Sequence, residues 1–194
     1  MTQARRAAAL IPALWALSLA GCSSVTTLLP LRGGADEARM ARYEGTWLME
    51  DRVIHVRRPD SGAVRLAALE WGRGGFRMEQ GEMYVTQAGD PDYLSVRLCE
   101  KGEWMESYYL LLARFTDGGD LILWAPLQDS FLDALRRGEL PGRTAGTGLP
   151  GESVLLTGPP DSLLGFLRRR GAEETFDLLS PMILRRLPPS PPGP

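Results

Sequence analysis

The sequence is poor in the residues from which most catalytic centres are built. Its 194 residues contain one histidine, His55, and two cysteines, Cys22 and Cys99. A metal site that needs several imidazoles or thiolates therefore has too few ligands. A Ser-His-Asp triad would have to use His55, and no Gly-x-Ser-x-Gly motif is present to carry the serine. A Cys99–His55 dyad is a conceivable nucleophile–base pair, but a cysteine within a strand is more often a small packing residue.

Acidic residues are not scarce, so residue types alone do not exclude a hydrolase that uses two carboxylates. The chain has 24 Asp and Glu residues, but the sequence does not show whether any two converge. The glycine-rich stretch 72–75 matches neither phosphate-binding loop pattern and predicts a turn. Because no recognisable catalytic motif is present, we predict that the protein is not an enzyme and that it uses neither a cofactor nor a metal.

Lysine and asparagine are nearly absent. Lys101 is the one lysine among 22 basic residues, there is no asparagine, and 24 acidic residues leave a net charge of −2. This skew is typical of a GC-rich genome, and it predicts no nucleic-acid partner. The arginine pairs and the triplet at 168–170 are interpreted as solvated charges. The alternative is that one of these clusters contacts lipid phosphates.

The N-terminus has the layout of an export signal. Two arginines precede an apolar run over residues 7–19, which is too short to span a bilayer as a stable helix. Leu-Ala-Gly-Cys follows at 19–22, and this motif resembles the lipobox of bacterial lipoproteins. The resemblance implies that residues 1–21 are a signal peptide removed on export. It also implies that Cys22 becomes the lipidated N-terminus, with a diacylglycerol on the thiol and usually an acyl chain such as palmitate on the amine.

The lipobox resemblance implies a location and a membrane partner as well. Several acyl chains anchor a protein stably, whereas a single chain binds only marginally. The residue after the cysteine is Ser23, not the aspartate that tends to retain lipoproteins in the inner membrane. The expectation is a protein anchored to the outer membrane with its domain in the periplasm. Because lipidation consumes Cys22, Cys99 has no intramolecular partner, and no disulfide is expected.

Composition divides the mature chain into three parts. Residues 22–35 contain Ser, Thr, Pro and a glycine pair, which predicts a flexible tether. Residues 36–187 are expected to form a single β-rich domain, long enough to bury a sizeable core. Residues 188–194 are mostly proline, which predicts a disordered tail. A short helix over 36–43 would lead into the first strand.

Alternating apolar residues predict an antiparallel β-meander. Leu94, Val96 and Leu98 alternate with polar neighbours, which is the period of a half-buried strand. Extended segments are also expected at 47–57, 64–71, 76–79, 82–85, 104–115, 121–124, 153–157 and 182–187, with a hairpin turn at 116–120. Turn signals recur about every 8–12 residues, which favours a mainly β fold. With the helices expected below, the class is α+β, and the meander is expected to close into a barrel-like body.

Two short helices are expected in the C-terminal third. Residues 129–138 and 161–171 each have a capping aspartate at the start, arginines in the last turn and a terminal glycine. Each segment follows a strand-like run, so the chain could hold a duplicated β-α unit. We prefer the alternative of two helices that meet the same capping demands, because two copies are too few for a repeat fold.

The segment 42–47, Arg-Tyr-Glu-Gly-Thr-Trp, resembles the Gly-x-Trp entry of lipocalins. In that family a short helical turn leads into the first barrel strand, the tryptophan plugs the closed end, and a late arginine packs over its ring. The resemblance implies structural roles for Gly45 and Trp47, with Arg185 in the last expected strand as the cation–π partner. The later Thr-Asp-Tyr motif of the family is present only as Thr-Asp-Gly at 116–118.

A barrel with an aromatic interior would provide a place for a ligand. The candidate ligand-binding residues are the four tryptophans of the mature chain, Trp47, Trp71, Trp104 and Trp124. We therefore predict a module that binds a small apolar or lipid-like ligand. A small barrel can instead be filled by its own side chains. In that case the alternative is an accessory or scaffold subunit that binds another envelope protein, with an enzyme as the third possibility.

Overall fold

The structure is a computed structural model that describes residues 24–33, 35–50, 52–59, 63–72, 75–100, 102–146 and 152–188. The signal peptide expected at 1–21 and the lipidation site expected at Cys22 lie outside the described residues, as does the proline-rich tail beyond residue 188. These three expectations therefore rest on the sequence.

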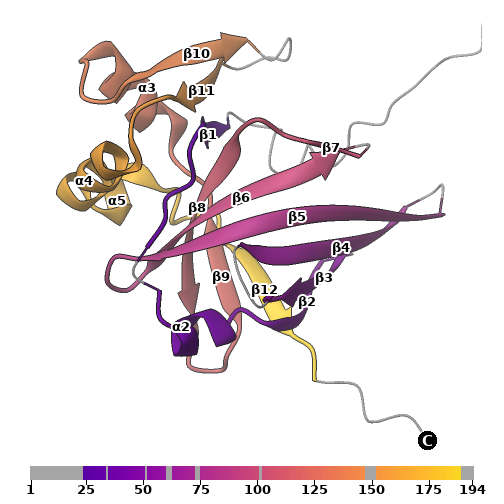
Figure 1. Ribbon diagram of the computed structural model, residues 1–194. Helices are drawn as coiled ribbons and strands as arrows, with labels where there is room; N and C mark the ends of the chain where they lie inside the picture. Colours follow the sequence, from indigo (N-terminus) through magenta and orange to yellow (C-terminus); the bar gives the residue numbers. More distant parts are fainter. Residues whose placement is uncertain are drawn as a thin grey trace, which may run out of the picture.

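Eight antiparallel strands form a closed barrel (Figure 1). In order around the barrel they are β2 (Gly45–Met49), β3 (Arg52–Arg57), β4 (Val64–Gly72), β5 (Gly75–Gln87), β6 (Asp92–Glu100), β8 (Tyr108–Phe115), β9 (Leu121–Trp124) and β12 (Met182–Arg186). The ring closes because β12 pairs with β9 through Ile183 and Ile122, and with β2 through Arg186 and Trp47. The mainly β, barrel-like fold expected from the alternation is confirmed.

Neighbouring residues of a barrel strand point to opposite sides of the wall. On β8, Leu111 and Ala113 belong to the core inside the barrel, whereas Leu110 and Leu112 belong to a second core outside it. The middle of β8 is therefore apolar at every position, because neither of its faces meets water.

A small α/β layer covers one outer side of the barrel. Strands β1 (Val25–Thr27), β11 (Glu152–Leu156) and β10 (Gly142–Gly146) extend the sheet from an edge of β8. Helices α3 (Gln128–Arg136), α4 (Pro160–Arg170) and α5 (Ala172–Thr175) lie on the same side of the molecule (Figure 1). The second core fills the space between this layer and the barrel, and Phe131 and Phe166 pack there with ring centroids 5.6 Å apart. Among the helices of the described part of the chain, none is long and apolar enough to span a membrane.

The two late helices lie close to where the sequence places them, but their N-termini differ from the expectation. α3 follows Leu127 and α4 follows Pro159, and neither residue provides a side-chain cap. Asp129 and Asp161 lie inside the first turn, where a negative charge interacts favourably with the helix dipole. The preceding strands differ too, because β9 is part of the barrel whereas β11 pairs in parallel with β1 outside it. This favours two independent helices over a duplicated unit.

The flexible tether expected over residues 22–35 is wrong for the part that the structure describes. Val25 and Leu31 are buried, and β1 pairs with both β8 and β11. The Leu31 amide also donates to Ser95 Oγ on β6, at 3.0 Å. The composition of a tether and that of a short strand can be similar. Here the Val-Thr-Thr run forms a strand because it pairs with two others. Folded structure therefore extends to Ser24, the first described residue.

Two of the expected strands are in fact pairs of strands. The segment 47–57 is a hairpin in which β2 ends at Met49 and β3 begins at Arg52, with Glu50 in the left-handed region at φ 52°. The chain therefore reverses within a segment that the sequence pattern predicts as one extended stretch. The segment 104–115 likewise divides into β7 (Glu103–Trp104) and β8.

One end of the barrel is closed by α2 (Glu37–Ala41), the short helix expected before the first strand. Asp36 caps α2 by accepting a hydrogen bond from the Arg39 amide at 2.7 Å. Tyr43 donates its hydroxyl to the fully buried carboxylate of Asp92 at 2.5 Å, and Arg39 Nε donates to the same oxygen at 2.7 Å. Burial and this hydrogen bond raise the pKa of Tyr43 far above its usual range. We call this end of the barrel the base and the opposite end the mouth.

Candidate ligand-binding cavity

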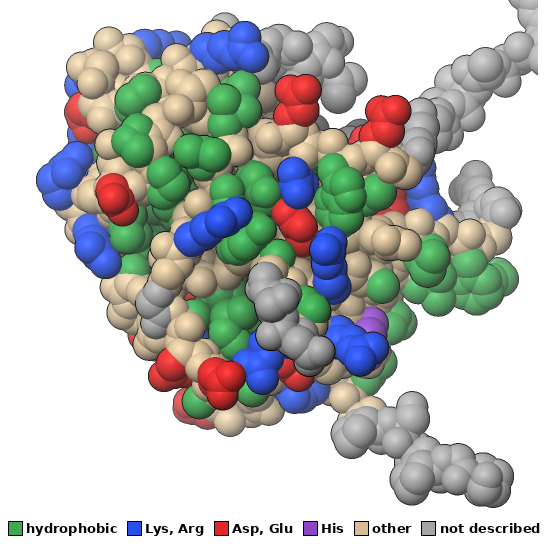
Figure 2. Space-filling view, viewed as in Figure 1, with side chains coloured by type: hydrophobic (Ala, Val, Ile, Leu, Met, Phe, Trp, Pro, Cys, Tyr) green, Lys and Arg blue, Asp and Glu red, His purple; other side chains and the backbone are tan. Residues whose placement is uncertain are grey.

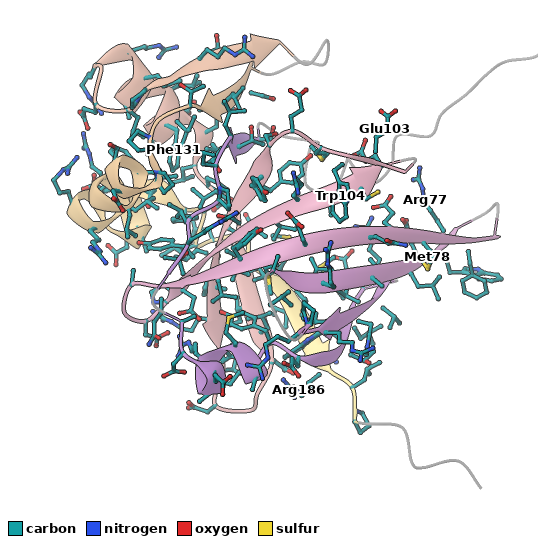
Figure 3. The ribbon with its side chains drawn as sticks, in the orientation of Figure 1. Arg77, Met78, Glu103, Trp104, Phe131 and Arg186 are labelled. Carbon is teal, nitrogen blue, oxygen red and sulfur yellow. The ribbon has the colours of Figure 1, made fainter. Side chains whose placement is uncertain are left out.

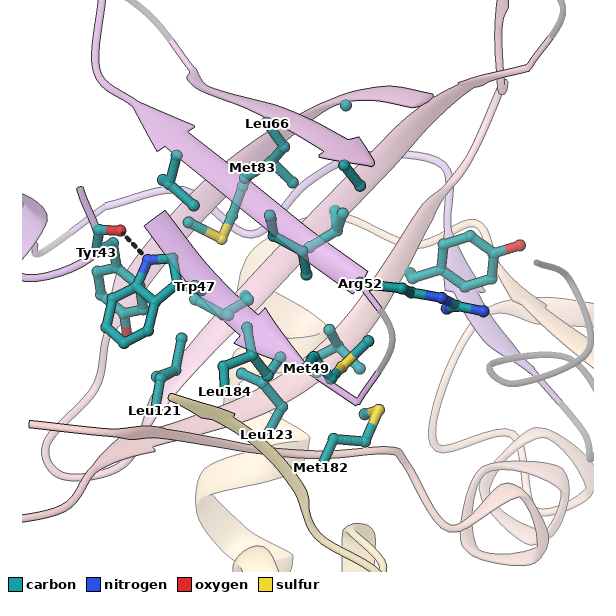
Figure 4. Close-up of a pocket in the computed structure, with 18 of the residues that line it drawn as sticks. Tyr43, Trp47, Met49, Arg52, Leu66, Met83, Leu121, Leu123, Met182 and Leu184 are labelled. Carbon is teal, nitrogen blue, oxygen red and sulfur yellow. Dashed lines mark hydrogen bonds between the residues drawn. The ribbon is translucent and has the colours of Figure 1, made fainter. Parts of the chain in front are cut away.

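The barrel is not filled by its own side chains. A cavity of about 400 Å³ lies between the inner faces of the strands. Small-molecule sites usually measure roughly 300–1,000 Å³, so this cavity is at the lower end of that range. Its apolar lining comes from all eight barrel strands: Trp47, Met49, Ile54, Val56, Leu66, Ala68, Met83, Leu94, Val96, Leu98, Leu111, Leu121, Leu123, Met182 and Leu184. Figure 4 shows side chains that enter this space from opposite walls.

Trp47 closes the cavity at the base. Its side chain is fully buried, and its indole Nε1 donates to the Tyr43 carbonyl at 2.9 Å (Figure 4). The Arg186 guanidinium lies over the indole ring, 4.6 Å from the ring centroid, and also donates to the Arg42 carbonyl. Gly45 has φ 131°, a conformation that favours glycine, and a Cβ there would lie 3.7 Å from Arg186 Nη1. The Gly-x-Trp segment is therefore the plug of the barrel.

The cation–π partner of Trp47 is Arg186, so the expectation of Arg185 is wrong by one residue. Met182 and Leu184 line the cavity, and Arg186 lies on the same face of β12 because side chains alternate along a strand. Arg185 is exposed on the outer face. A shift of one residue moves every side chain of a strand to the opposite face. Because β12 has apolar residues on both faces, its sequence does not show which face points inward.

The charged side chains in the described lining lie at the mouth. Arg52 is buried in the barrel wall, with its guanidinium 3.7 Å from the carboxylate of Glu70. Glu79 lies on β5, on the other side of β4 from Arg52, and its carboxylate is 3.6 Å from Arg77. Burial raises the pKa of Glu79, and the carboxylates of Glu100 and Glu70 raise it further against the opposing effects of Arg77 and Arg52. In Figure 4, Arg52 lies at the end of the cavity away from the Trp47 plug.

The hydroxyl of Tyr109 adds a neutral polar group to this lining. Burial raises the pKa of Tyr109, and the carboxylates of Glu100 and Glu79 raise it further. The phenol therefore stays protonated across the physiological range and can donate a hydrogen bond to a polar group at the mouth.

Sequence reasoning missed Arg52 and Glu79. A signal existed for Arg52, which lies two residues before Ile54 and therefore shares its inward face. For the segment 76–79 the alternation predicts that the apolar residues face inward. In the structure Phe76 is exposed and Glu79 lines the cavity. The β4–β5 hairpin extends beyond the packed core, so its inner face meets charge and water instead of apolar side chains.

Gly81 on β5 keeps part of the cavity open. A Cβ at this position would lie 3.3 Å from Leu66 Cδ1 and 3.3 Å from Leu98 Cδ2, and both leucines line the cavity. A larger side chain would therefore enter the space that a ligand needs.

Of the four candidate ligand-binding tryptophans, Trp47 alone lines the cavity. Trp71 and Trp104 are exposed at the mouth end, and Figure 3 labels Trp104 and Arg77 on the same side of the molecule. Trp124 packs against the second core, outside the barrel. The assignment is thus wrong for Trp71, Trp104 and Trp124, because aromatic content does not reveal which face of a strand a side chain occupies.

His55 and Cys99 do not form a dyad. His55 is exposed on β3, with Nδ1 3.1 Å from Thr46 Oγ1. In the sheet register His55 is opposite Ala67, Ala67 is opposite Gln80, and Gln80 is opposite Cys99. Three strand spacings, about 14 Å along the sheet, therefore separate the imidazole from the thiol. Within the described residues, no group of three or more His, Cys, Asp or Glu side chains is arranged to hold a metal ion.

In comparisons with known proteins, the chain matches no protein family, no curated protein and no solved structure. The eight-stranded barrel and the arrangement of Gly45, Trp47 and Arg186 at its base are consistent with the fold that the Gly-x-Trp resemblance implies. The function must therefore be argued from the cavity itself.

Proposed function

We propose that this protein is a lipid-anchored module of the cell envelope that binds one small apolar or lipid-like molecule inside its barrel. The observation that carries the proposal is the apolar cavity of about 400 Å³. Transfer of apolar surface from water into such a space contributes about 25 cal/mol per Å². Arg52, Glu79 and Tyr109 at the mouth would hold the polar end of the ligand, while its apolar body fills the interior.

The proposed location comes from the N-terminal segment. A diacylglycerol and an acyl chain on Cys22 would hold the protein at a membrane, and Ser23 favours the outer membrane with the domain in the periplasm. Ser24 already belongs to the folded domain, because its carbonyl accepts from the Val154 amide at 2.9 Å. Two extended residues reach about 7 Å, so the anchor would keep the domain next to the bilayer.

A fluorescence titration of the purified full chain tests the proposal. The probe is a neutral single-chain alcohol with an environment-sensitive fluorophore, and we expect saturable binding. Ala68→Phe places a ring in the cavity and should weaken binding roughly tenfold or more, a change of about 1.4 kcal/mol. Ala67→Phe is the matched control, because Ala67 is the next residue on β4 and faces away from the cavity.

Two outcomes would reject the cavity function. One is the absence of saturable binding by a folded wild-type chain, and the other is an equal loss of affinity in Ala68→Phe and Ala67→Phe. Native mass spectrometry of the protein from its own envelope identifies the natural occupant. A lipid-like mass supports the proposal, whereas a stoichiometric protein partner without any small molecule favours the scaffold alternative.

A further inference from the structure

The hairpin of β4 and β5 carries an apolar tip with no partner in the described fold. Trp71 is opposite Phe76 and Leu69 is opposite Met78, so these four side chains share one face. It is the outer face, because Ala68, the residue before Leu69, points into the cavity and side chains alternate along a strand. Trp71, Phe76 and Met78 are 61%, 68% and 66% exposed. Figure 2 shows apolar side chains at the right edge of the molecule, where this hairpin ends.

The two rings at the tip hold each other in place. Trp71 and Phe76 pack edge to face with their centroids 4.3 Å apart. The hairpin therefore presents a preformed aromatic pair to its surroundings, and ordering these side chains on contact with a partner costs little entropy.

A second apolar point lies on the same end of the barrel. Leu179, in the loop between α5 and β12, is 94% exposed, and its neighbour Leu178 is also exposed. Pro181 and Met182, which follow in the chain, line the cavity. Because β2 and β3 separate β12 from β4 around the barrel, the two apolar points stand at different places on the rim of one opening.

Carboxylates outnumber cations among the described residues of the mouth: Glu50, Glu70, Glu79, Glu100 and Glu103 against Arg52 and Arg77. The connecting segments add Asp51, Arg73 and Lys101 in the sequence, and these do not reverse the sign. A net negative mouth repels an anionic surface but tolerates a zwitterionic one. In Figure 3, Arg77, Met78 and Glu103 lie on the side of the barrel away from Arg186, which is at the base.

These features fit the interface of a bilayer. A stable protein interface usually needs a continuous surface of about 800 Å² on each partner, whereas the exposed apolar side chains here stand at separate points around an opening. Tryptophan and other apolar side chains on loop tips suit the boundary between headgroups and acyl chains. An apolar ligand also avoids exposure to water if the mouth opens directly onto the acyl phase.

We propose that the mouth of the barrel docks on a zwitterionic phospholipid bilayer, with Trp71, Phe76 and Leu179 inserted at the interface. An apolar ligand then passes between bilayer and cavity without crossing water. This inference rests on the proposed ligand-binding function and extends it by naming the surface from which the ligand comes.

The test uses the lipid-anchored full chain in phosphatidylcholine vesicles that contain brominated phosphatidylcholine, which quenches tryptophan on contact. We expect quenching of the wild type and a loss of the quenched component in Trp71→Phe. Phenylalanine keeps the tip apolar, so this variant removes the reporter but leaves docking intact. The double variant Phe76→Asp with Leu179→Asp should also lose the quenching while its circular dichroism stays native. Leu29→Asp is the matched control, because Leu29 is an exposed leucine beside Pro141 on the helical side.

The outcomes separate docking from ligand binding. Equal quenching of the wild type and Trp71→Phe would overturn the docking proposal, even if the alcohol probe binds. Quenching of Trp71 in a chain that does not bind the probe would support docking and reject the ligand-binding function. Replacing half of the phosphatidylcholine by phosphatidylglycerol should weaken the quenching. Stronger quenching on the anionic vesicles, or capture of a protein partner by the same rim residues, would overturn the proposal.

Discussion

Arg186 stabilises the base of the barrel through contacts that its neighbour Arg185 does not share. Its guanidinium covers the Trp47 ring and donates to the Arg42 carbonyl. We expect Arg186→Ala to lower the free energy of unfolding by about 0.5–2 kcal/mol, the range of a cation–π contact. Arg185→Ala, on the exposed face, should change it by less than about 0.5 kcal/mol. Urea denaturation of both variants measures the difference, and equal losses would contradict the assignment.

The carboxyl of Glu79 makes the fold less stable as the pH rises. Its pKa in the folded state is raised by burial and by Glu100 and Glu70, so the folded protein holds the proton more tightly than the unfolded chain does. Stability is therefore lost as the pH rises from the unfolded pKa through the folded pKa. We expect Glu79→Gln to have a higher Tm than the wild type near neutral pH and no gain below about pH 4, where the carboxyl is protonated in both states.

Thermal denaturation at the two pH values checks this sign. Glu106→Gln is the control, because Glu106 is an exposed glutamate between β7 and β8. A gain for Glu79→Gln that is the same at acidic and neutral pH would show that the effect comes from packing and not from titration.

At the scale of the elements, α3 and α4 are held to the barrel by the second core. Phe166 of α4 is fully buried against Phe131 of α3. We expect Phe166→Ala to cost about 3–5 kcal/mol of stability, as is usual when a buried ring is removed. Phe76→Ala, at the exposed hairpin tip, should cost far less in the same denaturation experiment. A loss below about 1 kcal/mol for Phe166→Ala would mean that the helical layer contributes little to the fold.

The positions of the strands could be predicted from the sequence, but not which side chains of each strand point into the barrel. Alternation locates β6, β9 and β12 and correctly indicates a closed meander. It does not say which phase points inward, because Leu110 and Leu111 on β8 are both buried, each in a different core. The same ambiguity explains the errors at Arg185 and at Trp124. A strand that is apolar on both faces carries no signal that separates inside from outside.

Other features depend on partners that are distant in the sequence. β1 forms because β8 and β11, more than 80 residues further along the chain, offer it open edges. The cavity is also a property of the closed barrel, since its space is enclosed only when all eight strands have paired, with the small residues Gly81 and Ala68 on its wall. The Trp47 plug is the part of the site that a local motif could predict, because the plug and its glycine are two residues apart.

At the scale of the whole molecule, the proposed lipid anchor would distinguish the two cysteines. Growth with an alkyne analogue of palmitate should label the wild type and leave Cys22→Ser without label. Cys99→Ser is the matched control, because Cys99 is the other cysteine of the chain and lies in β6. Its label should equal that of the wild type. Equal labelling of Cys22→Ser would show that the acyl chain is attached elsewhere or that the lipobox is not used.

The position of β12 in the ring has a consequence for how the protein is made. β12 is the last strand among the described residues and also the strand that joins β9 to β2. A nascent chain that stops before residue 182 is an open sheet with two unpaired edges, which invite pairing with other chains. The barrel can close only after β12 has been synthesised. In the proposed export, the barrel would therefore close only in the compartment in which translocation ends.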